Sequence, residues 1–346
     1  MRKLAALITL VTCLGLASSA SAAPRSFYGV VSAGGDPTIA DIDRMGKGKV
    51  GQMRINFLWP AVQPFENFTP NWTGYDEIVR RAAQNNIRIF PTIYGSPGWA
   101  ADKSKHPPKP EHLDEFEDYI RSAAERYGPG GSFWLLNPLL PKLPIEDWQI
   151  WNEVNSPTFW FSKPKAKQYK PLLVAASRGV KSVNPNSNIV LAGIFKTPQV
   201  KNGVPMGKYL SQLYRTGAKP YFDAVAIHPY ALNPQKALET LDEARRVLRR
   251  HKDGKTPMWI TELGWASSGI KTPVTVSPKK QARYLRQTFR RATKSRKRRK
   301  LAGVFWFCFR DQQPKFWIYR TGLLERSMKA KPSWRAFVKF TGGRPN

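Results

Sequence analysis

Residues 188–195 read Asn-Ile-Val-Leu-Ala-Gly-Ile-Phe, an apolar run in which polar and apolar side chains do not alternate. Such a strand is buried on both faces, which is typical of a parallel sheet covered by helices. Seven further apolar runs occur along the chain, and segments with the apolar spacing of helices lie between them. This strict alternation decides the fold class.

The alternation of strand and helix repeats eight times. Strands are predicted at 27–32, 52–59, 88–95, 146–152, 188–195, 224–230, 258–264 and 304–310, and helices at 37–45, 75–85, 111–127, 164–183, 206–216, 234–251, 278–293 and 333–340. Asn233-Pro234 and Ser277-Pro278 each place a cap residue before a proline at the first helical position. The pattern predicts an α/β fold, a single (β/α)8 TIM barrel, with an open doubly wound sheet as the weaker alternative.

The first 22 residues differ from the rest of the chain. Arg2 and Lys3 precede an apolar stretch over 4–17, and Ala20-Ser21-Ala22 follows. This order predicts a secretory signal peptide, because the apolar stretch is shorter than the roughly 20 residues of a membrane span. We therefore expect residues 23–346 to form one exported, monomeric domain, either extracellular or associated with the cell envelope.

The chain contains two cysteines, Cys13 and Cys308. Cys13 belongs to the expected signal peptide, so residues 23–346 can form no internal disulfide. Cys308 follows the apolar run Val304-Phe305-Trp306-Phe307, which favours a buried packing role over that of a nucleophile.

Basic residues dominate the composition: 56 Lys and Arg stand against 24 Asp and Glu, a formal net charge of +32. This balance favours anionic surroundings, and specific nucleic-acid binding would rest on charge alone because no recognised motif accompanies it. The densest run is Lys294-Ser295-Arg296-Lys297-Arg298-Arg299-Lys300. It fits either a solvated helix end or a tether to an anionic envelope polymer.

Barrel topology sorts the remaining segments into two faces. Loops that follow strands carry the chemistry, and loops that precede strands lie on the opposite face. The run Lys294–Lys300 precedes a strand, as do residues 128–144 with Trp134, which we expect to close the bottom of the barrel.

Two carboxylates end predicted strands on the chemical face. Glu153 follows Trp148-Gln149-Ile150-Trp151-Asn152, and Glu262 follows Trp259-Ile260-Thr261. One such glutamate taken alone is usually a solvated charge or an ion-pair partner. Two that are embedded in apolar strands indicate function. Burying a carboxylate costs on the order of several kcal/mol unless the group is paired or used in the chemistry.

Strands four and seven face each other across an eight-stranded barrel. Cleavage of a glycosidic bond needs two carboxyl groups, about 5 Å apart when one acts as nucleophile. A catalytically silent glycan-binding barrel is the alternative, but binding alone does not need a matched acid and nucleophile.

Trp151-Asn152-Glu153 and Thr261-Glu262-Leu263-Gly264-Trp265 resemble the strand ends of clan A glycoside hydrolases, which are retaining TIM-barrel glycosidases. The resemblance covers nearly all of residues 23–346. It implies Glu153 as acid/base, Glu262 as nucleophile, and Asn152 as a hydrogen-bond partner of the sugar 2-hydroxyl. A polysaccharide or oligosaccharide is the implied substrate.

Further residues match the clan in order along the chain. Arg54, His228 and Tyr230 are implied to orient the nucleophile or contact the sugar, although a structural role is the ordinary interpretation of His228. Trp306 is implied to floor the sugar subsite. Other tryptophans expected to stack on sugar rings are Trp59, Trp99, Trp160, Trp265 and Trp317.

Within the clan, Tyr94-Gly95 stands where some families have a histidine, which argues against a plain family 5 cellulase. Residues 128–134 and 316–334 look closer to family 39-like bacterial exopolysaccharide hydrolases. The chain lacks a His-x-x-x-His pair, a cysteine cluster and a P-loop, so no metal and no cofactor is expected.

Overall fold

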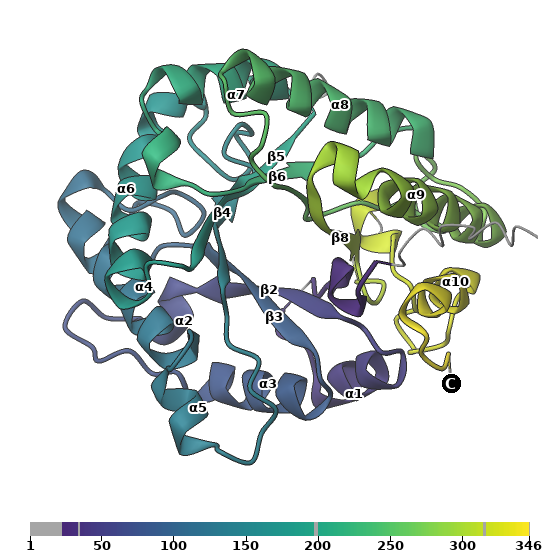
Figure 1. The fold of residues 1–346 in the computed structure, drawn as a ribbon, viewed down its shortest axis with the longest axis horizontal. Helices are drawn as coiled ribbons and strands as arrows, with labels where there is room; N and C mark the ends of the chain where they lie inside the picture. The colour runs from purple at the N-terminus through teal and green to yellow at the C-terminus, as the bar shows by residue number, and fades with distance from the viewer. Residues whose placement is uncertain (1–22, 34, 197–199, 314–315, 346) are drawn as a thin grey trace, which may run out of the picture.

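A computed structural model describes residues 23–33, 35–196, 200–313 and 316–345, so the expected signal peptide lies outside the described residues. Eight parallel strands follow one another around a closed barrel, with β8 paired to β1 (Figure 1). They are β1 (Tyr28–Val31), β2 (Gln52–Leu58), β3 (Arg88–Tyr94), β4 (Asp147–Asn152), β5 (Asn188–Phe195), β6 (Val225–His228), β7 (Met258–Ile260) and β8 (Leu301–Phe307). The prediction of a single (β/α)8 TIM barrel is confirmed.

Helices surround the barrel on its outer side (Figure 1). They are α1 (Ile39–Lys47), α2 (Trp59–Val62), α3 (Thr73–Gln84), α4 (Leu113–Tyr127), α5 (Ser132–Leu136), α6 (Ala166–Val183), α7 (Met206–Arg215), α8 (Pro234–Arg250), α9 (Pro278–Arg299) and α10 (Pro332–Thr341). None of the helices in the described ranges is both long and apolar enough to cross a bilayer.

Aromatic rings fill the inside of the barrel, below the end at which the strands finish. The Phe90 ring centroid lies 4.8 Å from that of Trp259 and 5.0 Å from that of Phe305. Gly29 on β1 makes room for this layer, because a Cβ there would stand 2.3 Å from the Phe305 ring. The interior is therefore a packed core, as in other barrels of this size.

The eighth repeat differs from its prediction. Helix α9 continues six residues past 293, and β8 covers 301–307 instead of 304–310. The helix continues because Ala292, Ser295 and Arg299 keep its buried face in register, and Arg299 donates to Asp242 of α8 at 2.8 and 2.7 Å. Lys300 then ends the helix in a left-handed conformation with φ of 52°. The basic run is thus mostly helix.

Residues 128–144 do not close the barrel, so that prediction is wrong. Helix α5 lies beside α3 and α4 at the periphery (Figure 1). The Trp134 indole N–H donates to the Tyr127 carbonyl at 2.9 Å, which holds the segment on the outer helices. Leu136 and Leu139 remain exposed at 73% and 98% of their surface.

Candidate active site

The two glutamates predicted from strand ends meet at the mouth of the barrel. Glu153 directly follows β4, and Glu262 lies two residues beyond β7. Carboxyl oxygens of the two residues lie within 4.8 Å of one another. Both side chains are largely buried, at 13% and 9% exposure.

Glu262 is held by two donors. Arg54 Nη1 donates to one carboxylate oxygen at 2.8 Å, and the Tyr230 hydroxyl donates to the other at 2.9 Å. Burial raises the pKa of Glu262, whereas the Arg54 guanidinium and the Tyr230 hydrogen bond both act to lower it. These contacts favour the ionised carboxylate.

Glu153 has the opposite surroundings. Burial raises its pKa well above the ordinary value, the negative charge of Glu262 raises it further, and only Arg54 opposes the rise. Of the two carboxyl groups, Glu153 therefore keeps its proton to the higher pH.

His228 contacts the acid side of the site. Its Nδ1 lies 2.8 Å from a Glu153 oxygen, and its Nε2 lies 3.0 Å from the Thr261 hydroxyl. Complete burial, with Arg54 nearby, lowers the pKa of His228 well below 6.5, so the ring is neutral. A single proton is consequently shared across the contact between Nδ1 and Glu153. Gly193 on β5 lets the ring lie there, because a Cβ at that position would stand 1.9 Å from Nε2.

Arg54 links the two halves of the site. Besides Glu262, its guanidinium donates to Gln149 Oε1 at 2.7 Å and to Asn152 Oδ1 at 3.0 Å. Thr92 donates to the same Gln149 oxygen at 3.1 Å. Because the Asn152 oxygen accepts from Arg54, the amide N–H groups face away from the guanidinium.

The backbone at the end of β4 is strained. Trp151 and Glu153 adopt positive φ angles of 70° and 40°, which cost non-glycine residues about 1–3 kcal/mol each. Packing maintains this conformation: the Trp151 indole donates to the Phe159 carbonyl at 2.8 Å, and Asn155 donates to the carbonyls of Phe195 and Val204, both at 2.9 Å. The strain directs the Glu153 side chain into the mouth.

Two tryptophans predicted to contact sugar lie elsewhere. Trp265 and Trp306 are fully buried outside the barrel, where Trp265 packs against Tyr284 of α9 and the Trp306 indole donates to the Thr321 carbonyl. The residue that faces inward on β8 is Phe307, whose ring centroid lies 6.5 Å from that of Tyr230. The prediction that Trp306 forms the floor of the sugar subsite is therefore wrong, and its neighbour Phe307 is the residue that faces the site.

The other tryptophans divide in the same way. Trp59 and Trp160 are fully buried, so they belong to the core. Trp99 and Trp317 are partly exposed, and Trp317 stands edge-on to Tyr230 at 5.4 Å between centroids. Trp317 is thus the ring best placed beside the catalytic pair.

Sequence reasoning missed four residues of the site. Gln149 and Thr261 connect Arg54 to His228, Gly193 makes room for the imidazole, and Phe307 lines the mouth. Gln149 did carry a signal, since it is a polar residue inside the apolar run Trp148–Trp151. The others carry none that a single sequence shows.

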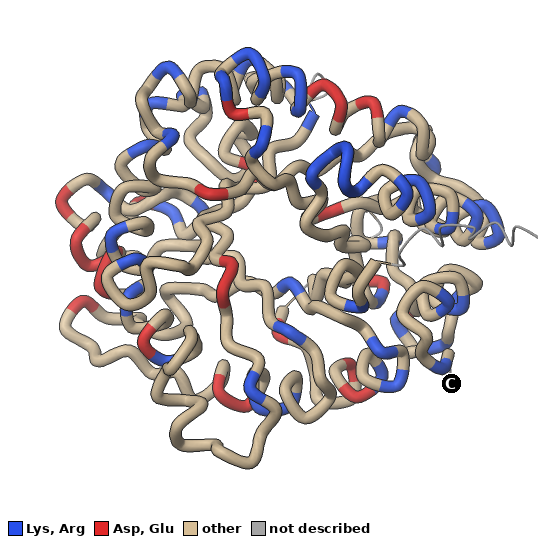
Figure 2. Tube along the Cα trace, in the orientation of Figure 1, with Lys and Arg blue, Asp and Glu red and all other residues tan. Residues whose placement is uncertain are grey.

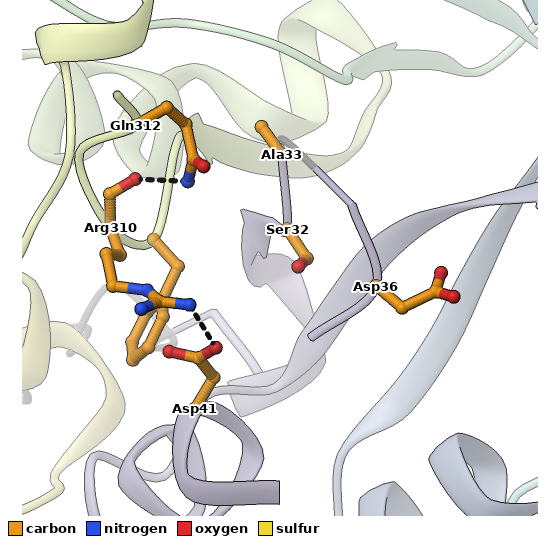
Figure 3. A pocket seen from close by; sticks show the side chains of 7 residues that line it. Ser32, Ala33, Asp36, Asp41, Arg310 and Gln312 are labelled. Atoms are coloured by element: carbon orange, nitrogen blue, oxygen red, sulfur yellow. Dashed lines mark hydrogen bonds and ion pairs between the residues drawn. The ribbon is translucent and has the colours of Figure 1, made fainter. Parts of the chain in front are cut away.

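A small polar cavity opens on the same rim, where β1 and β8 end (Figure 3). It is lined by Ser32, Ala33, Asp36, Asp41, Phe309, Arg310 and Gln312. Arg310 donates to the buried Asp41 carboxylate at 2.8 Å, and the Gln312 amide donates to the Arg310 carbonyl at 2.9 Å. These contacts fasten the segment after β8 to the start of α1.

Two groups of side chains in the described ranges have the spacing of metal ligands. They are Glu66, His112 and Glu115 at the rim, and Glu153, His228 and Glu262 in the mouth. In the second group Arg54 already occupies an oxygen of Glu262 at 2.8 Å, so a cation there would meet a fixed positive charge. The donor set of the mouth fits proton transfer and nucleophilic attack by a carboxylate better than metal binding.

An eight-stranded barrel with two facing carboxylates at its mouth is the arrangement of the glycoside hydrolases. The family model described as glycosyl hydrolase catalytic core matches residues 152–324, half of the chain, and the chain belongs to this family. The expected membership of clan A is confirmed. No curated protein matches the sequence.

Solved structures agree on the fold. A family 39 glycoside hydrolase from Bacteroides cellulosilyticus matches with a TM-score of 0.68 and 19% identity, over 92% of this chain and 63% of that enzyme. A glucosidase from Croceicoccus marinus gives 0.66 and 16%, over 92% and 67%. A subfamily 18 family 5 enzyme from Bifidobacterium longum, in complex with Manβ1-4GlcNAc, gives 0.63 and 17%, over 88% and 72%. The chain thus spans less than two thirds of the family 39 enzyme.

Proposed function

We propose that the protein hydrolyses O-glycosidic bonds of a polysaccharide or oligosaccharide with retention of anomeric configuration. The observation that carries this proposal is the closeness of the two carboxyl groups: one oxygen of Glu153 lies no more than 4.8 Å from an oxygen of Glu262. Retaining enzymes hold the two groups about 5–5.5 Å apart, whereas inverting enzymes hold them about 6.5–9.5 Å apart to admit a water.

In the first step, a Glu262 oxygen attacks the anomeric carbon while Glu153 gives its proton to the glycosidic oxygen. The bond to the leaving alcohol breaks, and a glycosyl ester forms on Glu262. In the second step, the Glu153 carboxylate takes a proton from water, and that water attacks the anomeric carbon and releases Glu262. Both glutamates return to their starting protonation states.

The neighbours of each glutamate suit its role. Arg54 and Tyr230 favour an ionised nucleophile, and burial beside Glu262 favours a protonated acid. In the glycosyl ester the Glu262 charge is lost, so the pKa of Glu153 falls and the group becomes a base for the second step.

Sugar contacts follow from the groups around this pair. The Asn152 amide N–H groups face away from Arg54 and can donate to a hydroxyl next to the anomeric carbon. Phe307 and Trp317 offer apolar ring surface beside Tyr230. A site built from rings and amides fits a neutral pyranose at the point of cleavage.

We also propose that residues 1–22 direct export of the chain and that the enzyme works outside the cytoplasm as a monomer. Support comes from the order of basic, apolar and small residues before Ala23. N-terminal sequencing of secreted protein and light scattering of the purified enzyme test the two parts of this proposal.

The decisive experiment is proton NMR of the first-formed product from an aryl glycoside, run on a panel of sugars. Retained configuration, together with a glycosyl adduct trapped on Glu262 by a fluorosugar, supports the proposal; an inverted product contradicts double displacement. Glu153→Ala should keep measurable turnover on substrates with good leaving groups, and azide should raise it. Glycan binding without any turnover across the panel would instead favour a silent binding barrel.

A further inference from the structure

Helix α9 carries the strongest concentration of charge in the molecule. Half of its 22 residues are Lys or Arg, and none is Asp or Glu. Its buried face, which includes Ala282, Leu285, Phe289 and Ala292, packs on the barrel and on α10. Six cations on the outward face recur at intervals of three or four residues, and we call them the basic stripe: Lys279, Arg283, Arg286, Arg290, Lys294 and Lys297.

The basic stripe runs the height of the barrel. At 1.5 Å per residue α9 is about 33 Å long. Its first residues follow the loop after β7, so Lys279 lies near the catalytic rim, and Lys297 lies near the opposite end, close to the start of β8. Figure 2 shows the row of basic residues along α9, with further basic positions on the neighbouring α10.

Helix electrostatics do not account for the whole basic stripe. Cations in the last turn interact favourably with the helix dipole, which covers Lys297. In the first turn a cation is unfavourable, yet Lys279 and Lys280 stand there and no acid does. Like charges spaced three or four residues apart on a helix also repel one another and destabilise it. A bound polyanion would relieve both effects.

The surroundings of the basic stripe select the kind of polyanion. After Pro278, the fully exposed residues of α9 are all basic or polar, so the face has no apolar side chain to insert into a lipid surface and no exposed ring on which a base can stack. Helices α8 and α10 flank α9, which prevents it from entering a nucleic-acid groove. A flexible, linear chain with regularly spaced negative charges fits this straight row.

We propose that the basic stripe binds a linear acidic polysaccharide. Carboxylate groups along the chain would pair with the successive cations, and the end of the stripe at Lys279 leads toward the catalytic mouth. The interaction retains the enzyme on a charged glycan matrix. It extends the run Lys294–Lys300 into a surface along the full helix, and it does not depend on the proposed hydrolysis.

Binding to polygalacturonate, a linear polymer of carboxylated sugars, tests this proposal. The stripe variant Arg283→Gln, Arg290→Gln, Lys294→Gln, Lys297→Gln removes four exposed cations. Their side chains make no hydrogen bond or ion pair with any residue in the described part of the chain. The control variant Lys142→Gln, Lys167→Gln, Lys208→Gln, Lys255→Gln removes the same charge from exposed positions elsewhere. Gln keeps a helix propensity close to that of Arg and Lys.

The stripe variant should bind polygalacturonate at least about tenfold more weakly at low salt, with a shallower salt dependence, and the control should change by about twofold or less. Both should retain the melting temperature and the turnover of a small aryl glycoside. Equal weakening by both variants would mean that net charge alone is responsible for binding, and would overturn the proposal. Tighter binding of the wild type to duplex DNA or to anionic phosphatidylglycerol vesicles than to polygalacturonate would overturn it as well. Glu262→Gln should bind polygalacturonate as tightly as the wild type. The binding result can therefore be interpreted even if Glu262 is not the nucleophile.

Discussion

Two residues of the same type receive different roles from their neighbours. Glu262 contacts a guanidinium and a phenol, which lower its pKa against the effect of burial. Glu153 contacts a neutral imidazole and lies beside a negative charge, so its pKa is well above the ordinary value. Because the shift of Glu153 depends on the charge of Glu262, the two carboxyl groups titrate as a pair.

Glu262→Gln should separate these effects. The substitution removes the carboxylate that attacks the sugar, and turnover should fall by about 10³-fold or more. It also removes the negative charge that raises the pKa of Glu153. That pKa should therefore fall toward the ordinary value of a glutamate, but burial should hold it above that value. A ¹³C NMR titration of the Glu153 carboxyl in both proteins measures the change. An unchanged pKa would show that Glu262 does not influence its partner.

The pH dependence of the wild type follows from the same shift. The reaction begins with protonated Glu153, so turnover should fall as pH rises through the raised pKa of this group. The alkaline limb of the profile should therefore lie above the ordinary range of a glutamate and disappear in Glu153→Ala. A limb that survives this substitution would have to be assigned to another group.

Gly193→Ala should disturb the acid without removing it. A Cβ at residue 193 would stand 1.9 Å from His228 Nε2, so the imidazole must move and its contact with Glu153 is lost. We expect turnover to fall about tenfold or more, with a shifted alkaline limb, at a stability cost of about 1–3 kcal/mol. Gly29→Ala is the matched control, because its clash with Phe305 lies in the packed interior. It should lower stability and leave the pH profile unchanged.

At the scale of elements, strand and helix alternation could be read from the sequence, but the direction of each side chain could not. A strand buried on both faces has no polar alternation, so nothing in Val304-Phe305-Trp306-Phe307 tells which residues face the barrel. The residues that the resemblance to clan A implied beside the nucleophile, Arg54 and Tyr230, do meet Glu262. Gln149 and Gly193 were missed because their roles depend on side chains of other strands, Arg54 for Gln149 and His228 for Gly193.

Trp306 and Phe307 should respond differently to truncation although they are neighbours. Trp306→Ala leaves a cavity between β8 and α9 and should cost about 3–5 kcal/mol of stability, with little change in KM for molecules that fold. Phe307→Ala removes a ring beside Tyr230 and should lower kcat/KM about tenfold with a smaller loss of stability. Thermal melts and kinetics on the same aryl glycoside give both values. A raised KM in Trp306→Ala without loss of stability would show that Trp306 contacts the sugar.

At the scale of the whole molecule, residues 23–346 contain a single cysteine, so the barrel core must supply the stability. Cys308 is completely buried among inward-facing residues, its thiol donates to the Arg310 carbonyl at 3.0 Å, and burial raises its pKa to about 12. The reactive thiolate is therefore almost absent at pH 8 while the barrel is closed.

We expect no labelling by iodoacetamide in the native state and rapid labelling in denaturant, where the thiol recovers an ordinary pKa of about 8.5. Between these limits the labelling rate of Cys308 should follow the denaturant dependence of global unfolding, because the thiol is completely buried and bonded to the Arg310 carbonyl. A reducing agent should leave the melting temperature unchanged. Fast native labelling would show that the segment after β8 opens by itself, and that would place the end of β8, beside Glu262, among the mobile parts of the catalytic rim.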